Sequence, residues 1–105
     1  MNTENARAQM RKGVLELCAL RVVRKGEAYT SDLSAALKQA DLLVVEGTLY
    51  PLLTRLKNAG WLEYRWEESK SGPPRKYYKL TPNGERLLET LDQEWNQFVQ
   101  AVNSL

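Results

Sequence analysis

The stretch "EGTLYPLLTRLKNAGWL", residues 46 to 62, decides the fold. Its leucines at positions 49, 52, 53 and 56 recur at the three- and four-residue steps of one helix face, and Gly60 supplies a left-handed stop. Pro51 is expected in the second turn, where a lost backbone hydrogen bond would kink the helix. The outer face carries polar side chains: Thr48, Tyr50, Thr54, Arg55 and Lys57.

Two more helices are predicted upstream of this segment. The first runs from about Asn5 to Arg24, where apolar side chains follow the helical spacing, and Gly26 ends it. Thr30 or Ser31 is expected to cap the second, which ends near residue 41. The segment at 46 to 62 is then the third helix in a row.

A hairpin is predicted next. "WLEYRWEE" at 61 to 68 and "RKYYKL" at 75 to 80 alternate between apolar and polar residues, as half-buried strands do. Trp61 and Trp66 are interpreted as core and hairpin packing. The tip "SKSGPP" has too little apolar surface to fold inward, so it should project into solvent.

A long helix is predicted to close the chain, with Thr81 as its cap and Pro82 at its first position. Apolar side chains follow at steps of three and four, which is typical of a coiled-coil seam. A helix of about 24 residues would be about 36 Å long, more than a domain of this size can cover. We therefore expect a second copy to pack on this seam, formed by Leu88, Leu91, Trp95, Phe98, Val102 and Leu105.

The length and composition favour one soluble domain. A chain of 105 residues with 43% hydrophobic and 27% charged residues suits a single packed core. The apolar stretch at 14 to 23 is interrupted by Glu16 and Arg21, so no membrane-spanning helix is expected. The start of the chain lacks the order of a secretory leader, and the cytoplasm is the expected location.

Catalytic, metal and cofactor sites are not expected. The chain has no histidine and one cysteine, Cys18, which lies among apolar neighbours and reads as a small buried hydrophobe. The adjacent Glu67 and Glu68 would point to opposite faces of a strand, so they do not form a pair of catalytic carboxylates. An enzyme is thus the least favoured interpretation.

Charge is distributed unevenly along the chain. Residues 55 to 81 carry seven basic and three acidic side chains, whereas residues 82 to 105 carry one basic and four acidic ones. A polyanion would therefore meet the middle of the chain. A local excess of this size also occurs on plain solvated surfaces.

The predicted order of elements is that of a winged helix-turn-helix, in the mainly α class with a small β-hairpin (α+β). In such a fold the third helix enters the major groove and basic residues of the wing contact phosphates. The candidate DNA-binding residues are Thr48, Tyr50, Thr54 and Arg55 on the helix and Lys70, Arg75, Lys76 and Tyr77 on the wing. Two alternatives stay open: an exposed helix face without a ligand, and a winged helix that holds a protein partner.

The segment "GTLYPLLTRLKNAGWLEYRWEESKSGPPRKYYKLTPNGERLL" closely resembles the signature region of the PadR family of bacterial transcriptional regulators. The resemblance implies that the Gly-Thr-Leu-Tyr-Pro-Leu-Leu run is the recognition helix, that Arg-Lys-Tyr-Tyr follows the wing tip and that Leu-Thr-x-x-Gly opens the last helix. The chain departs from many members at Val45 and at "AYTSDL", where only Tyr29 matches.

The resemblance further implies a homodimeric repressor whose C-terminal helices supply most of the dimer contact. We therefore expect it to bind a palindromic operator in double-stranded DNA, with residues 1–81 as the DNA-binding domain and residues 82–105 as the dimerisation helix. The chain is similar to the compact members without an additional C-terminal domain. Some members respond to phenolic acids and others to planar hydrophobic drugs, so a small aromatic effector is an open expectation. If a flat ligand is bound, Trp95 is the residue expected to hold it; plain packing in the dimer is the alternative role for this side chain.

Overall fold

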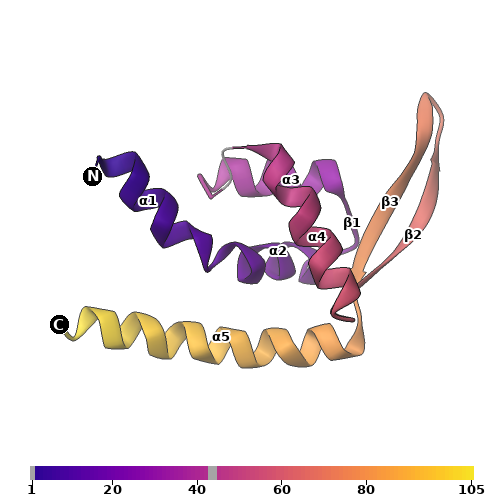
Figure 1. Ribbon diagram of the computed structural model, residues 1–105. Coiled ribbons are helices and arrows are strands. Elements are labelled where there is room, and N and C mark those ends of the chain that lie inside the picture. Colours follow the sequence, from indigo (N-terminus) through magenta and orange to yellow (C-terminus); the bar gives the residue numbers. More distant parts are fainter. Residues whose placement is uncertain (1, 43–44) are drawn as a thin grey trace.

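The computed structural model describes residues 2–42 and 45–105, and these form five α-helices, one short 3-10 helix (η1) and a three-stranded sheet (Figure 1). The predicted α+β class is confirmed. The elements are α1 (Thr3–Lys12), α2 (Leu15–Arg24), β1 (Ala28–Tyr29), α3 (Thr30–Gln39), η1 (Glu46–Thr48), α4 (Leu49–Asn58), β2 (Leu62–Ser69), β3 (Gly72–Leu80) and α5 (Pro82–Asn103). Among these helices, none combines the length and hydropathy needed to cross a bilayer.

The single helix expected from about residue 5 to residue 24 is in fact two helices, α1 and α2, separated at Gly13 and Val14. Glycine is among the weakest helix formers, and α1 has no buried side chain that would hold it in line with α2. The end of α1 instead contacts the segment that follows α3, where Arg11 Nη1 donates a hydrogen bond of 3.0 Å to the carbonyl oxygen of Asp41.

The starts of α3 and α4 differ from the predictions. Tyr29, rather than Thr30 or Ser31, precedes α3, and its backbone N–H donates to Asp32 Oδ2 at 2.9 Å. The helix expected from residue 46 begins with the η1 turn, so Pro51 is the third residue of α4. The first-turn N–H groups of a helix lack an intrahelical partner, so the proline removes little there. The predicted place of Pro51, in the second turn of the helix, is therefore wrong.

The hairpin of β2 and β3 is longer than predicted and has a third strand beside it. The order is β1-β3-β2, with all pairs antiparallel, and β1 joins through Ala28 opposite Tyr78 and Tyr29 opposite Tyr77. The strands extend to Ser69 and Gly72, so Pro73 and Pro74 lie within β3 rather than in the turn. They face an irregularity between Glu67 and Ser69, which is where a strand tolerates residues without an N–H.

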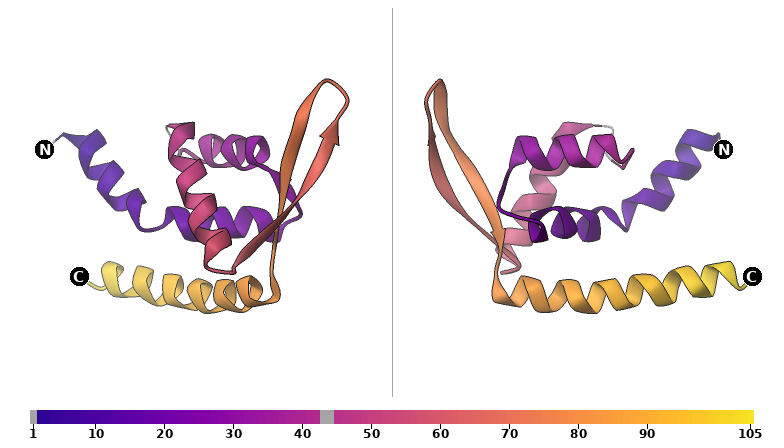
Figure 2. Two further views of the ribbon diagram at one scale, coloured as in Figure 1. Left: turned by 45° about the vertical axis from the view of Figure 1, so that its right-hand side comes forward. Right: turned by 180° about the vertical axis from the view of Figure 1, so that it is seen from behind.

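The core lies where α2, α3 and α4 meet the base of the sheet and the first half of α5. Figure 2 shows that the hairpin leaves this body and projects away from it, while α1 and the end of α5 extend on the other side. Gly60 ends α4 at φ 83°, which confirms the left-handed stop. The core side chains include Leu20, Leu33, Leu37, Leu49, Leu53, Leu56, Leu62 and Leu88.

Two sets of contacts hold α5 to the rest of the chain. The predicted cap is confirmed: Thr81 Oγ1 accepts a hydrogen bond from the Gly84 N–H at 2.9 Å, and it donates one to the carbonyl oxygen of Gly60 at 2.6 Å. Further along α5, Asp92 pairs with Arg21 at 2.8 Å and with Arg24 at 2.5 Å, both on α2.

Candidate nucleic-acid interface

The outer face of α4 is the polar face that the sequence singled out, and it has two flanks. The hairpin of β2 and β3 is the wing. Tyr50 and Thr54 line a cleft on the side of the wing, whereas Thr48 and Arg55 line a second cleft on the side of α1 and α2. Pro51 lies exposed beside the second cleft. The four residues predicted for this helix are therefore all on its surface, but they do not point in one direction.

The first cleft, which we call the wing cleft, lies between α4, the start of α3 and the inner face of the hairpin. It has a volume of about 580 Å³ and unites the side chains of Tyr50, Thr54, Arg75 and Lys76. Thr30 and Ser31 also line it. Three elements thus bring hydroxyl groups and two cations to one opening, and the carboxylate of Glu46, which also lines it, pairs with Lys38 at 3.9 Å. This arrangement suits a phosphate backbone.

Lys76 is held in place by two aromatic rings of β2. Its Nζ lies 4.6 Å from the ring centre of Tyr64 and 5.6 Å from that of Trp66. Such cation–π contacts favour a lysine close to the rings over a freely moving one. The charge of Lys76 is therefore directed along the inner face of the wing, toward the wing cleft.

Trp66 lines this cleft in addition to packing in the hairpin as predicted. It was expected to pack in the hairpin, and its ring does meet Tyr64 edge-on at 5.9 Å, but the side chain is 61% exposed and lines the wing cleft. Trp66 lies two residues beyond Tyr64, the last residue of β2 that packs against the core. This position toward the hairpin tip is the signal that could have predicted an exposed side chain. Thr30 and Ser31 were missed because they were assigned only a capping role.

Two other predicted wing residues lie outside the cleft. Tyr77 packs on Tyr29, with ring centres 4.5 Å apart, and the guanidinium carbon of Arg65 lies over the Tyr77 ring, 4.8 Å from its centre. Its role in the structure is to join β1 to β3. Lys70 is at the turn between the strands, exposed at the far end of the hairpin.

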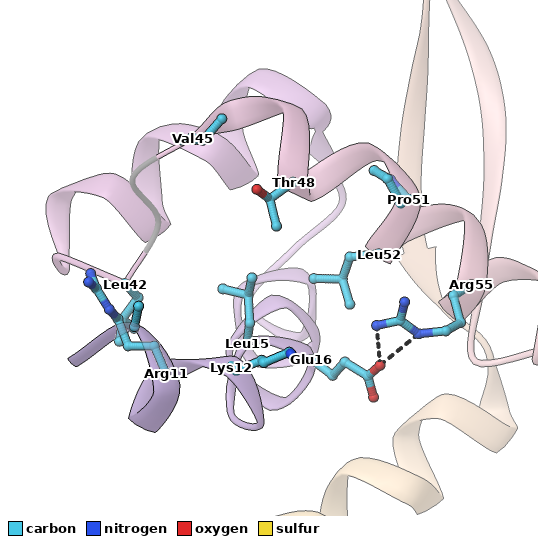
Figure 3. Close-up of a pocket in the computed structure, with 11 residues that line it drawn as sticks. Arg11, Lys12, Leu15, Glu16, Leu42, Val45, Thr48, Pro51, Leu52 and Arg55 are labelled. Carbon is cyan, nitrogen blue, oxygen red and sulfur yellow. Dashed lines mark hydrogen bonds and ion pairs between the residues drawn. The ribbon is translucent and has the colours of Figure 1, made fainter. Parts of the chain in front are cut away.

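The second cleft, on the opposite flank of α4, has a volume of about 450 Å³ and is drawn in Figure 3. Leu15 and Leu52 form its apolar floor, and Arg11 and Lys12 come to its edge from the end of α1. Arg55 also lies there, since its Nε and Nη2 donate to Glu16 Oε1 at 2.8 and 2.5 Å (Figure 3).

The residues of the predicted dimer seam on α5 differ in how far the chain's own core covers them. Leu88 is 1% exposed within the chain's own core, so it has no surface to offer a second copy and its prediction as a dimer contact is corrected. Leu91 and Trp95 pack partly against that core. Phe98 and Val102 are 66% and 53% exposed and have no such cover.

Among the described residues three side chains have clearly shifted pKa values, and none of the three lies at the tip of the wing. Hydrogen bonds from Arg24 and Arg21 hold the pKa of Asp92 below its usual range, against a smaller opposing effect of burial. Burial raises the pKa of Cys18 and of Tyr78. A raised thiol pKa keeps Cys18 protonated and unreactive, in accord with the structural role expected for it.

The comparisons with known proteins decide the family. The model of the "Transcriptional regulator PadR-like family" matches residues 19–90, which include α3, α4, the wing and the start of α5. The chain belongs to this family. This PadR-like chain is thus a member of a family of transcriptional regulators, and the resemblance seen in the sequence is confirmed.

Solved structures of PadR-like proteins share the fold. A PadR-like transcription factor from Bacteroides fragilis is 55% identical, with 95% of this chain and 97% of that chain covered and a TM-score of 0.79. A PadR-like transcriptional regulator from Bacillus cereus is 39% identical, with 91% and 94% covered and the same TM-score of 0.79. Bacillus subtilis PadR, solved in complex with operator DNA, is 26% identical, with 74% of this chain and 46% of that chain covered and a TM-score of 0.68.

Proposed function

We propose that this PadR-like protein is a homodimeric repressor that binds a palindromic operator in double-stranded DNA. The observation that carries the proposal is the wing cleft, where Tyr50 and Thr54 of the recognition helix face Arg75 and Lys76 of the wing. A helix of this kind fits the major groove while the wing follows the backbone. The operator complex of Bacillus subtilis PadR supports the proposal.

The proposed DNA contacts and the proposed dimer contacts lie in different parts of the chain, the former in the basic part and the latter in the acidic part. Residues 1–81 would contact DNA and residues 82–105 would pair with a second copy, since the exposed seam residues Phe98 and Val102 lie on α5 beyond its contact with the core. Two-fold symmetry then places the two recognition helices about one helical turn of DNA apart, or a multiple of it.

Binding should depend steeply on salt, because each phosphate contact releases counterions and contributes about −0.9 to the slope of log K against log salt. Arg75→Gln combined with Lys76→Gln removes two cations from each protomer. For a dimer the slope should therefore become shallower by about 3 to 4. Fluorescence anisotropy measures the affinity at each salt concentration, with a duplex that the wild-type protein has selected from a random library. Lys79→Gln is the control, since Lys79 pairs with Glu63 at 3.3 Å and lies outside the cleft.

The DNA assignment fails if the wild-type protein shows no salt dependence and the double variant loses no affinity. If Lys79→Gln loses as much DNA affinity per charge as the double variant does, the affinity depends on net charge rather than on the wing cleft.

The proposal includes release from DNA by a planar aromatic effector next to Trp95. Trp95 is partly buried on α5, between Leu91, which is also partly buried against the core, and the exposed Phe98. Pairing of two α5 helices would bring two copies of Trp95 close together, and flat ligands stack on such rings. Titration with a phenolic acid and with a planar dye should quench tryptophan fluorescence in the wild type and not in Trp95→Phe; equal quenching in both would exclude this site.

A further inference from the structure

The recognition helix has a second charged flank, opposite to the wing. We call the residues on it the flank strip: Lys12 at the end of α1, Glu16 on α2 and Arg55 on α4, all three lining the second cleft. Figure 3 shows their side chains along one edge of that cleft, across from Thr48 and Val45 at the start of the recognition helix. The wing cleft, which carries the function proposed above, does not include this flank, although Arg55 is one of the predicted DNA-binding residues.

The geometry of Arg55 leaves part of it free. Nε and Nη2 both donate to the same oxygen, Oε1 of Glu16, and within residues 2–42 and 45–105 Nη1 has no partner. The side chain is 61% exposed. Glu16 therefore fixes the direction of the guanidinium without enclosing it, and one edge with N–H donors stays turned to solvent.

Lys12 adds a cation that the rest of the described chain does not neutralise. It is exposed, and no carboxylate in residues 2–42 and 45–105 pairs with it. Lys12 and Arg55 carry two positive charges against the one negative charge of Glu16, so the flank strip is net positive. Arg11 lines the same cleft, although its Nη1 is used by the carbonyl oxygen of Asp41.

We propose that the flank strip binds the sugar-phosphate backbone on the side of the major groove opposite to the wing. A helix that lies in the groove, about 12 Å wide, has a backbone on each side. The wing, with Arg75 and Lys76, takes one of them, and Lys12 and Arg55 take the other. Glu16 is a positioning residue, because it orients Arg55 and does not itself touch the phosphate.

This proposal rests on the proposed DNA-binding function and adds a contact to it. A direct test compares the salt dependence of binding for the wild type, Lys12→Gln and Lys12→Arg, with the duplex selected by the wild-type protein. Lys12→Gln should lower the slope by about 0.9 for each lost contact, or about 2 for a dimer, and Lys12→Arg should restore it. Lys25→Gln, at the opposite end of α2, removes the same charge and should leave the slope unchanged.

A second measurement separates a phosphate contact from an indirect effect on folding or pairing. In the selected duplex, individual phosphates are replaced by uncharged methylphosphonates along both edges of the groove. Neutralising the backbone away from the wing should weaken binding by the wild type more than binding by Lys12→Gln, because the variant has already lost the Lys12 contact and keeps only that of Arg55. Neutralising the backbone at the wing should weaken both proteins.

The two hypotheses fail in different ways. If Lys12→Gln keeps the wild-type slope while Arg75→Gln with Lys76→Gln lowers it, the flank strip does not bind DNA and the proposed function stands. The same conclusion follows if the methylphosphonates on the far edge weaken the wild type and Lys12→Gln equally. If the wild type binds no duplex at all, the proposed function itself is wrong.

Discussion

Gly84 lies so close to Trp61 that a side chain does not fit between them. A Cβ added at Gly84 would overlap with the carbonyl oxygen of Trp61 and come within 2.9 Å of the carbonyl carbon. These atoms belong to the backbone just before β2, so they cannot move aside as a flexible side chain does. The close approach fixes where α5 leaves the hairpin, and thereby the direction of the predicted dimer helix relative to the wing.

Gly84→Ala should therefore destabilise the fold by about 1 to 3 kcal/mol, the usual cost of forcing an atom into a packed region. Urea unfolding followed by circular dichroism measures this free energy of unfolding. Gly26→Ala is the matched control, since its Cβ would meet no atom within 4 Å and its φ is not positive. Equal stability of the two variants would contradict the packing argument.

Trp66→Ala should reduce DNA affinity while leaving the free energy of unfolding almost unchanged. The side chain is 61% exposed, so its removal costs little burial, yet it lines the wing cleft and holds Lys76. Anisotropy titration and urea unfolding of the same variant give the two numbers. A loss of stability above about 2 kcal/mol with unchanged affinity would restore Trp66 to the hairpin-packing role predicted from the sequence.

The helices that carry a long apolar stripe could be predicted from the sequence, because their period is set by local geometry. Leu49, Leu52, Leu53 and Leu56 all lie in the core, and Gly60 has the positive φ that its position required. Thr81 and Pro82 also stand where the capping pattern placed them. In each case the signal and the structure that it predicts lie within a few residues of one another.

The missed features depend on residues that are far apart in the sequence. A helical pattern places Arg55 on the outer face, but Glu16, which is 39 positions earlier, determines where its guanidinium points. The bend between α1 and α2 likewise involves Asp41, 30 positions after Arg11. β1 has two residues, too few for a period, and exists because Tyr77 and Tyr78 pair with it.

The Asp92 ion pairs should make stability depend on acid. Because Arg24 and Arg21 hold the pKa of Asp92 below its unfolded value, the pairs stabilise the fold above the ordinary carboxyl pKa of about 3.9 and are lost as pH falls through the folded value. Asp92→Asn should thus be less stable by about 1 kcal/mol at pH 7, and the difference should vanish in strong acid.

Urea unfolding across a pH series measures this difference. Glu94→Gln is the control on the same helix, because Glu94 is exposed and pairs with no cation in the described residues. A gap between wild type and Asp92→Asn that persisted at low pH would mean that the asparagine disturbs packing rather than the ion pairs.

The proposed dimer should depend on the exposed part of the α5 seam. Phe98→Glu places a charge on a side chain that is 66% exposed in the single chain and would be covered in the dimer, where an unpaired carboxylate is costly. Light scattering should then give a dimer for the wild type at micromolar concentration and a monomer for the variant, with helix content retained. Gln100→Glu, on the opposite face of α5, should remain dimeric. A wild type that is monomeric and fully folded would refute the dimer, and with it the expected pairing of two recognition helices on one operator.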